Sequence, residues 1–180
     1  MKKIFLIIIA TISFISCKKE ETLQTYFVDN SEKQQFLVQD IAPSILNLDN
    51  SKLSAEQKKA LKTFEKLNIL AYKPKSNSKQ DLAAYETEKN KVQSILKDKK
   101  YQELIKVGSG KDGASISFVG DENHIDEFVV YGAKKENGFA VIRILGNDMN
   151  PADAMTFLSL LQKSNVNVDE LKGLQQFINN

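Results

Sequence analysis

The sequence is poor in the residues that most often carry out chemistry or bind metals. Among its 180 residues it has one cysteine, one histidine, one arginine and no tryptophan. A single cysteine excludes an intramolecular disulfide and a metal site built on several thiolates, and a lone histidine disfavours a transition-metal site. One arginine, Arg143, leaves little for bidentate recognition of phosphate or guanine. The composition therefore argues against several kinds of site and points to no particular function.

The only cysteine follows a short hydrophobic leader. Two lysines open the chain, an apolar run covers residues 4–15, and Ser16 comes directly before Cys17. A basic start and an apolar stretch of about 7 to 15 residues are typical of a secretory signal, and such a stretch is too short to span a bilayer. We predict a lipoprotein signal peptide over residues 1–16 and lipidation of the Cys17 sulfur, although Phe14 replaces the usual aliphatic residue. A buried free cysteine or an uncleaved anchor is the alternative.

Removal of this leader changes the charge of the chain. The formal net charge of +2 comes from Lys2 and Lys3, so 23 basic and 23 acidic side chains remain without residues 1–16. A domain that is neutral overall does not indicate a strongly basic face for nucleic acid. Two or three acyl chains hold a protein on a membrane, whereas one does so only marginally. We expect a lipid-anchored protein of the cell envelope, in the outer membrane, with exposure at the cell surface left open.

The remaining chain divides into a tether and a folded part. Residues 17–30 are predicted to form a lipidated tether, since residues 18–21 are all charged and residues 22–30 show weak apolar periodicity. Residues 31–180 are long enough to bury a core and are predicted to form a single domain.

The first part of this domain is predicted to be mainly helical. Apolar residues at helical spacing predict a helix from Phe36 to Leu46, which Pro43 would kink or end. Ser54 and Gln57 form a capping-box pattern at the start of a second helix. The apolar face of that helix consists of Leu61, Phe64 and Leu67. The short apolar string at residues 69–72 predicts a buried strand.

A third helix begins near Ser78 or Asp81. Its inward positions are Leu82, Tyr85, Lys89, Val92 and Leu96. Its charged residues are expected to form a solvated face and comprise Glu86, Glu88, Lys89 and Lys91.

The apolar period then changes from helical to two, which predicts strands. Four strands are expected at residues 101–107, 114–119, 125–131 and 139–145. Asn137-Gly138 is a favourable hairpin turn. Asn150-Pro151 and Asp153 predict the start of a helix that buries Met155, Leu158 and Leu161. Asp169 is expected to cap a last helix that carries Leu171, Leu174, Phe177 and Ile178. The predicted fold is α+β, with a mainly antiparallel sheet of about four to five strands packed against helices, after a helical N-terminal part.

Two motifs suggest specific sites but have simpler interpretations. The string from Gly108 to Gly113 matches G-x-G-x-x-G, yet a dinucleotide site needs a helix after it, and here a strand follows. We interpret these glycines as turn residues. His124 lies near Asp121 and Asp126, which makes these three residues weak candidates for a metal site. A polar turn between two strands is the stronger interpretation, since a transition metal usually needs a second histidine or a thiolate, so no metal and no cofactor is assigned.

Arg143 lies at the centre of a predicted strand, between Ile142 and Ile144. We expect it to face solvent or to pair with a carboxylate. The spacing of residues in the sequence does not bring a nucleophile, a histidine and an acid together as a triad. We therefore assign no catalytic residue.

The strand at residues 139–145, followed by Gly146 and a helix, together with the leader ending at Cys17, resembles a known family. The family is that of small Bacteroidetes lipoproteins, domain of unknown function 4252 (DUF4252). The resemblance covers about residues 31–165 and includes the short strand at residues 69–72. It implies an α+β fold and an envelope location, and it implies no catalytic residue.

The same resemblance gives the charged residues after Cys17 a second interpretation. Surface lipoproteins of these bacteria often carry a lysine followed by acids, which is similar to a surface-export signal. The residues concerned are Lys18, Lys19, Glu20 and Glu21. A charged flexible tether without a sorting role is the alternative.

Two hypotheses of function remain. The first is a non-enzymatic binding or interaction module, in which an exposed sheet face or the helices dock another envelope protein. The second is a small-ligand or metal-binding carrier, or an unrecognised hydrolase, that uses the turns near His124 and Gly108. The second hypothesis predicts a concave pocket with convergent polar groups.

Overall fold

The structure of the protein, a computed structural model, describes residues 21–42, 50–109, 112–134 and 137–163. Its elements, in chain order, are α2 (Leu23–Asn30), β1 (Phe36–Ile41), the 3-10 helix η3 (Asn50–Lys52), α3 (Ala55–Thr63), β2 (Phe64–Tyr72), α4 (Lys79–Ile95), β3 (Gln102–Ser109), β4 (Asp112–Asp121), β5 (His124–Lys134), β6 (Gly138–Met149) and α5 (Pro151–Lys163). The predicted α+β class is confirmed.

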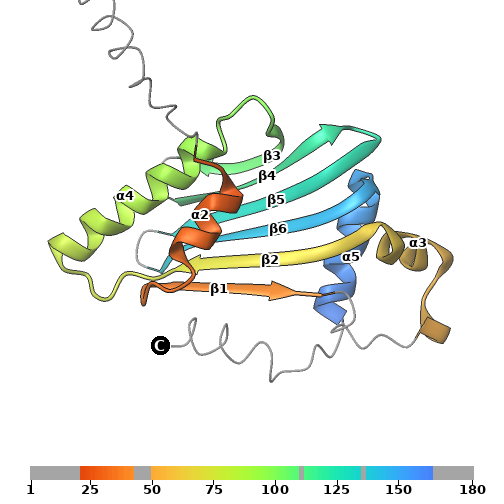
Figure 1. The fold of residues 1–180 in the computed structure, drawn as a ribbon, viewed down its shortest axis with the longest axis horizontal. Coiled ribbons are helices and arrows are strands. Elements are labelled where there is room, and N and C mark those ends of the chain that lie inside the picture. Colours follow the sequence, from red (N-terminus) through yellow and green to blue (C-terminus); the bar gives the residue numbers. More distant parts are fainter. Residues whose placement is uncertain (1–20, 43–49, 110–111, 135–136, 164–180) are drawn as a thin grey trace, which may run out of the picture.

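The strands form one sheet in the order β1-β2-β6-β5-β4-β3, and every neighbouring pair is antiparallel (Figure 1). Strands β3 to β6 follow one another as hairpins. Strand β2, which is distant from β6 in the sequence, pairs with it along its whole length, from Phe64 opposite Gly146 to Tyr72 opposite Phe139. The antiparallel sheet is as predicted, but it has six strands rather than four to five because β1 adds an edge.

One face of the sheet packs against α2 and α4 (Figure 1). The core on this side is rich in aromatic rings. Tyr72 and Phe139 are register partners, and their rings stack with centroids 5.3 Å apart. Tyr85 of α4 and Tyr26 of α2 close over the same cluster. Each large side chain buried here stabilises the fold by about 1.5–3 kcal/mol.

The opposite face packs against α3 and α5, which lie together at one end of the sheet (Figure 1). Phe157 of α5 lies against Phe64 of β2, with ring centroids 3.8 Å apart. Ile125, Ile144 and Met149 complete this second core. The sheet is therefore the middle layer of three, with a separate apolar core on each face.

The predicted tether over residues 17–30 is wrong for its second half, which forms α2. Thr22 caps the helix, since its hydroxyl accepts from the Thr25 backbone N–H at 3.2 Å. Leu23, Tyr26 and Phe27 are buried in the core under α2. The pattern was missed because the helix has only two turns and also buries a polar residue, Asn30.

The helix predicted from Phe36 to Leu46 is also wrong where the structure describes it. Residues 36–41 form the edge strand β1, which pairs with β2 from Phe36 opposite Tyr72 to Ile41 opposite Leu67. Most of β1 is only partly buried on both sides, so its sequence shows no clear alternation. The rest of that predicted helix, including Ile45 and Leu46, lies outside the described residues.

The capping box of Ser54 and Gln57 is confirmed at the start of α3. The helix ends earlier than predicted, at Thr63. Phe64 and Leu67, which were expected on its apolar face, instead belong to β2 and bury their side chains in the sheet. The predicted strand at residues 69–72 is the second half of β2.

Helix α4 and the four following strands are confirmed. Ser78, rather than Asp81, is the N-cap of α4, and the Asp81 backbone N–H donates to its hydroxyl at 3.1 Å. Hydrogen bonds from Ser76 and Ser78 lower the pKa of the Asp81 carboxyl. The strands extend beyond the predicted limits because their hairpins are tight.

Helix α5 begins as predicted, through reciprocal bonds between Asn150 and Asp153. The inward position assigned to Met155 is wrong, since this side chain is 55% exposed while Ala154 and Phe157 are buried. The side chains of Leu158 and Leu161, and the last helix predicted from Asp169, lie outside what the structure describes.

Gly138 is predicted to be indispensable for the β5–β6 turn. Its φ is +100°, and a Cβ atom placed there would lie 1.8 Å from the Tyr72 carbonyl oxygen. Gly138→Ala should lower the free energy of unfolding by about 3 kcal/mol. Gly132→Ala in the neighbouring strand is the matched control, since nothing lies within 4 Å of the added methyl group. Urea denaturation measures both variants, and equal losses would contradict the prediction.

Candidate functional site

The residues predicted for lipidation and sorting lie mostly outside the described residues. This applies to Cys17, Lys18, Lys19 and Glu20, while Glu21 is exposed just before α2. Within the described residues, no helix is both long enough and apolar enough to cross a membrane.

The weak metal candidates lie at the β4–β5 turn. Asp121 and His124 are register partners, and the His124 ring contacts the Asp148 carboxylate of β6. Asp126 is exposed on β5 beside a register shift. In the described part of the chain, no three histidine, cysteine, aspartate or glutamate side chains are grouped closely enough to hold a metal ion.

The glycine string Gly108 to Gly113 is a hairpin, as interpreted from the sequence. Gly108 pairs with Gly113, and Ser109 with Asp112, so strands lie on both sides of the turn. Gly108 has a φ of +82°, and a Cβ atom there would lie 2.5 Å from the Asp112 carbonyl oxygen. No helix opens at this turn, so the geometry of a dinucleotide site is absent from it.

Arg143 is buried and paired, which confirms the second of its two predicted environments. Its Nε donates to Glu127 Oε1 at 2.7 Å, and a terminal nitrogen donates to Gln24 Oε1 at 2.7 Å. The guanidinium also lies 5.5 Å from the centroid of the Phe27 ring. Arg143 therefore ties α2 to the sheet, and its charge is neutralised by Glu127 rather than offered to a ligand.

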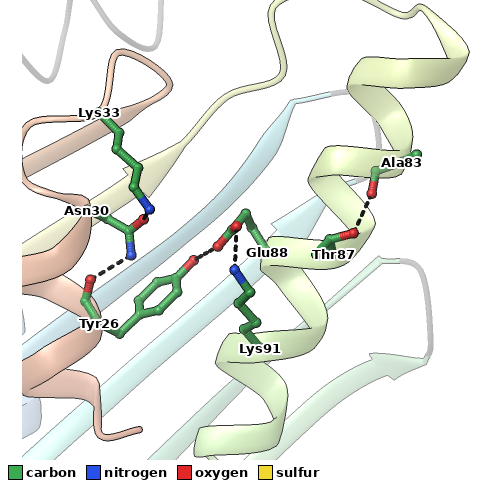
Figure 2. Close-up of polar contacts among 7 residues, drawn as sticks. All are labelled: Tyr26, Asn30, Lys33, Ala83, Thr87, Glu88 and Lys91. Carbon is green, nitrogen blue, oxygen red and sulfur yellow. Dashed lines mark hydrogen bonds and ion pairs between the residues drawn. The ribbon is translucent and has the colours of Figure 1, made fainter.

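The charged face predicted for α4 is partly wrong because α2 covers it. The Tyr26 hydroxyl donates to Glu88 at 2.8 Å, and Lys91 pairs with the same carboxylate (Figure 2). Burial and this carboxylate raise the pKa of Tyr26 well above its ordinary value. Lys89 is only 3% exposed, and its ammonium pairs with Glu86 at 2.6 Å. The bond from Tyr26 to Glu88 joins α2 to α4, whereas the two lysine pairs lie within α4.

A larger candidate lies on the face that carries α3 and α5. The residues concerned, called here the open face, are all partly or fully exposed and comprise Ile105, Val107, Ala114, Ile116, Val130, Gly132, Ala140 and Ile142. They come from β3, β4, β5 and β6 (Figure 1). Ile116 and Ile142 pack against the core under α5, and Ile116 and Val130 line a small hollow with Ala154 and Met155 of α5. Val107 is 65% exposed and Ile105 46%, and Leu104 and Met155 beside them are also exposed.

The strand register arranges the open face in two rows across the sheet. One row is a ridge of large aliphatic residues, Ile142, Val130, Ile116 and Ile105. The other is a trough of small residues, Ala140, Gly132 and Ala114, closed at the edge by Val107. A hollow of about 840 Å³ follows the trough. Exposed apolar surface of this shape is typical of an interaction site.

A second hollow, called here the α4 pocket, lies on the opposite face under the end of α4. It has a volume of about 270 Å³. Its roof comes from Gln93, Leu96 and Lys97, and its floor includes Lys106, Ser115, Ser117 and Tyr131. Gln93 donates to the Tyr131 hydroxyl at 3.3 Å. Burial raises the pKa of Tyr131 to about 12, so the phenol is protonated at neutral pH.

The sequence suggested an exposed sheet face and a pocket near Gly108, and Gly108 lines both hollows, but the other residues that form the two surfaces were not identified. The strand pattern shows which residues alternate, but it does not show which face a helix covers. The serines at positions 115 and 117 alternate with apolar residues, and this alternation is compatible with either face being covered. In the structure this polar face of β4 lies towards α4, and the apolar face of β4 contributes to the open face.

The chain was compared with known families, curated proteins and solved structures. The family model described as Domain of unknown function (DUF4252) matches residues 26–157. The match begins inside α2 and ends inside α5, so it includes the whole sheet, the open face and the α4 pocket. No curated protein matches the chain, and no solved structure matches it.

The buried pair of Arg143 and Glu127 should be costly to break. Glu127→Gln leaves a buried guanidinium without its counter-charge, and we expect the free energy of unfolding to fall by about 3 kcal/mol. Glu103→Gln is the control, because its pair with Lys106 is exposed and should be worth less than about 1 kcal/mol. Urea denaturation compares the two variants. Similar losses in the free energy of unfolding from Glu127→Gln and Glu103→Gln would contradict the prediction that the buried pair contributes more than the exposed one.

Proposed function

The chain belongs to the family Domain of unknown function (DUF4252), and we propose that it is a non-enzymatic binding module anchored in the cell envelope. In this proposal the open face docks an apolar segment of another envelope protein. The observation that carries it is the pair of apolar rows that stay partly or fully exposed on the sheet face that carries α3 and α5.

The shape of the open face, a ridge beside a trough, favours a helical segment as the partner. A helix packs its side chains into a groove, and the trough of Ala140, Gly132 and Ala114 allows the partner backbone to come close. The ridge that runs through Ile142 and Val130 would lie along one side of that helix. Four strands spaced about 4.8 Å apart span roughly 14 Å, which matches about ten helical residues.

The site contains no arrangement for covalent chemistry. Its side chains are aliphatic, and aliphatic groups contribute by leaving water, at about 25 cal/mol per Å² of apolar surface. This favours binding over catalysis at the open face.

Photocrosslinking tests the docking proposal directly. A photoreactive phenylalanine analogue in place of Val107 should crosslink, in native membranes, to an apolar helical segment of another envelope protein identified by peptide mapping. The same analogue at Val28 is the control, since Val28 is equally exposed, at 62%, but lies on α2 on the other face.

A folded but blocked variant completes the experiment. Gly132→Val places a branched side chain in the trough at a position where the added Cβ atom meets no atom within 4 Å, so it should abolish the Val107 adduct and change the free energy of unfolding by less than about 0.5 kcal/mol. Adducts with a second copy, with residues 169–178 of the same chain, or equally from Val28 would overturn the proposal.

The envelope location rests on the leader and Cys17, whose sulfur is proposed to carry the lipid. Cys17→Ser should lose all incorporation of labelled palmitate and should leave the membrane fraction, because no other thiol exists in the chain. Gel fluorography and membrane fractionation measure the two effects. Retention of label by the variant would contradict lipidation at this residue.

A further inference from the structure

We infer that the α4 pocket is a binding site for a small organic carboxylate, and this inference does not depend on the docking proposed for the open face. Val107 and Ala114 line both the pocket and the hollow of the open face, whereas Lys97, Ser115, Ser117 and Tyr131 line only the pocket. The pocket lies on the face of the sheet that α2 and α4 cover, whereas the open face lies on the other. Its volume of about 270 Å³ is just below the usual range for drug-sized ligands, so it suits a molecule no larger than a monosaccharide.

The floor of the pocket is polar where a packed core would be apolar. Ser115 is the register partner of Tyr131, and Ser117 that of Val129, so both serines point towards α4 like the buried side chains of β5. Ser117 is only 5% exposed, and it lines the pocket together with Ser115. Both hydroxyls are therefore available to bond to a ligand that enters the pocket.

The available groups are mainly hydrogen-bond donors. The Tyr131 oxygen already accepts from Gln93, which leaves its O–H to donate into the pocket. Lys97 at the rim donates only, and the serine hydroxyls can donate as well. The acceptor-only group, Glu103, is already paired with Lys106 at 3.0 Å. A ligand that complements this set must be rich in acceptor oxygens.

The charge of the lining favours an anion. Two ammonium groups, Lys97 and Lys106, face one carboxylate, Glu103. The end of α4 adds only about half a negative charge. The remaining positive charge and the hydroxyl donors match a carboxylate, which forms the shorter and stronger charge-assisted hydrogen bonds.

The test uses matched pairs of probes with the full-length protein. Acetate, lactate and glucuronate are compared with acetamide, lactamide and glucose by NMR titration and by thermal midpoint. At least one carboxylate should bind with a Kd of about 1 mM or tighter, shift the Ser117 and Tyr131 amide signals, and raise the midpoint. Its neutral analogue should bind at least about tenfold more weakly.

Two variants with matched controls assign the binding to this pocket. Ser117→Val should abolish binding, whereas Thr87→Val, which removes a hydroxyl elsewhere on α4 (Figure 2), should leave it unchanged. Lys97→Gln should weaken binding about tenfold or more, and Lys79→Gln at the start of α4 should not. The thermal midpoints without ligand show that each variant is folded.

Three outcomes would overturn the inference. These are the absence of binding by every carboxylate probe, equal binding by the carboxylates and their neutral analogues, and binding that persists in folded Ser117→Val. None of these measurements depends on the open face, so docking and ligand binding can fail independently.

Discussion

The antiparallel pairing of β2 with β6 holds the other elements together. Because side chains alternate along both strands, this one pair places Leu70 and Val141 in the core under α2 and α4, and Ile144 in the core under α5. Edge strand β1 joins the sheet only through β2, and strands β5, β4 and β3 join it only through β6. Both apolar cores therefore pack on the same two strands, and both depend on the pairing of β2 with β6.

Strand β4 links the two candidate binding surfaces through the sheet. Its apolar residues Ala114 and Ile116 point to the open face, while its serines, Ser115 and Ser117, point to the α4 pocket. This reverses the usual arrangement, in which apolar side chains face the covered side of a sheet and polar ones face water. Stability alone does not explain this arrangement of β4, because exchanging its two serines with Ala114 and Ile116 would bury more apolar surface. The binding proposed on both faces would give it a physical reason.

Elements whose signals are local could be predicted from the sequence. The capping box of Ser54 and Gln57 and the period-two strands after Tyr101 depend on nearby residues, and the structure confirms them. Strand β1 and helix α2 could not be predicted, because β1 is an edge strand without clear alternation and α2 is stabilised by distant contacts such as Gln24 with Arg143. The same limit applies to the sites. The alternation of Ser117 with Phe118 is visible in the sequence, but only the packing of α4 shows that the serine is covered.

The early start of α2 alters how an anchored molecule would meet a partner. With a lipid on Cys17, only residues 18–22 separate the anchor from the first helical residue, Leu23, and five extended residues reach at most about 18 Å. A sheet of six strands is about 24 Å wide, so the tether is shorter than the domain that it holds. Such a tether would keep the domain close to the membrane. The open face would then be held at a high effective concentration relative to proteins of the same membrane, which reduces the entropic cost of binding them compared with binding by a freely diffusing protein.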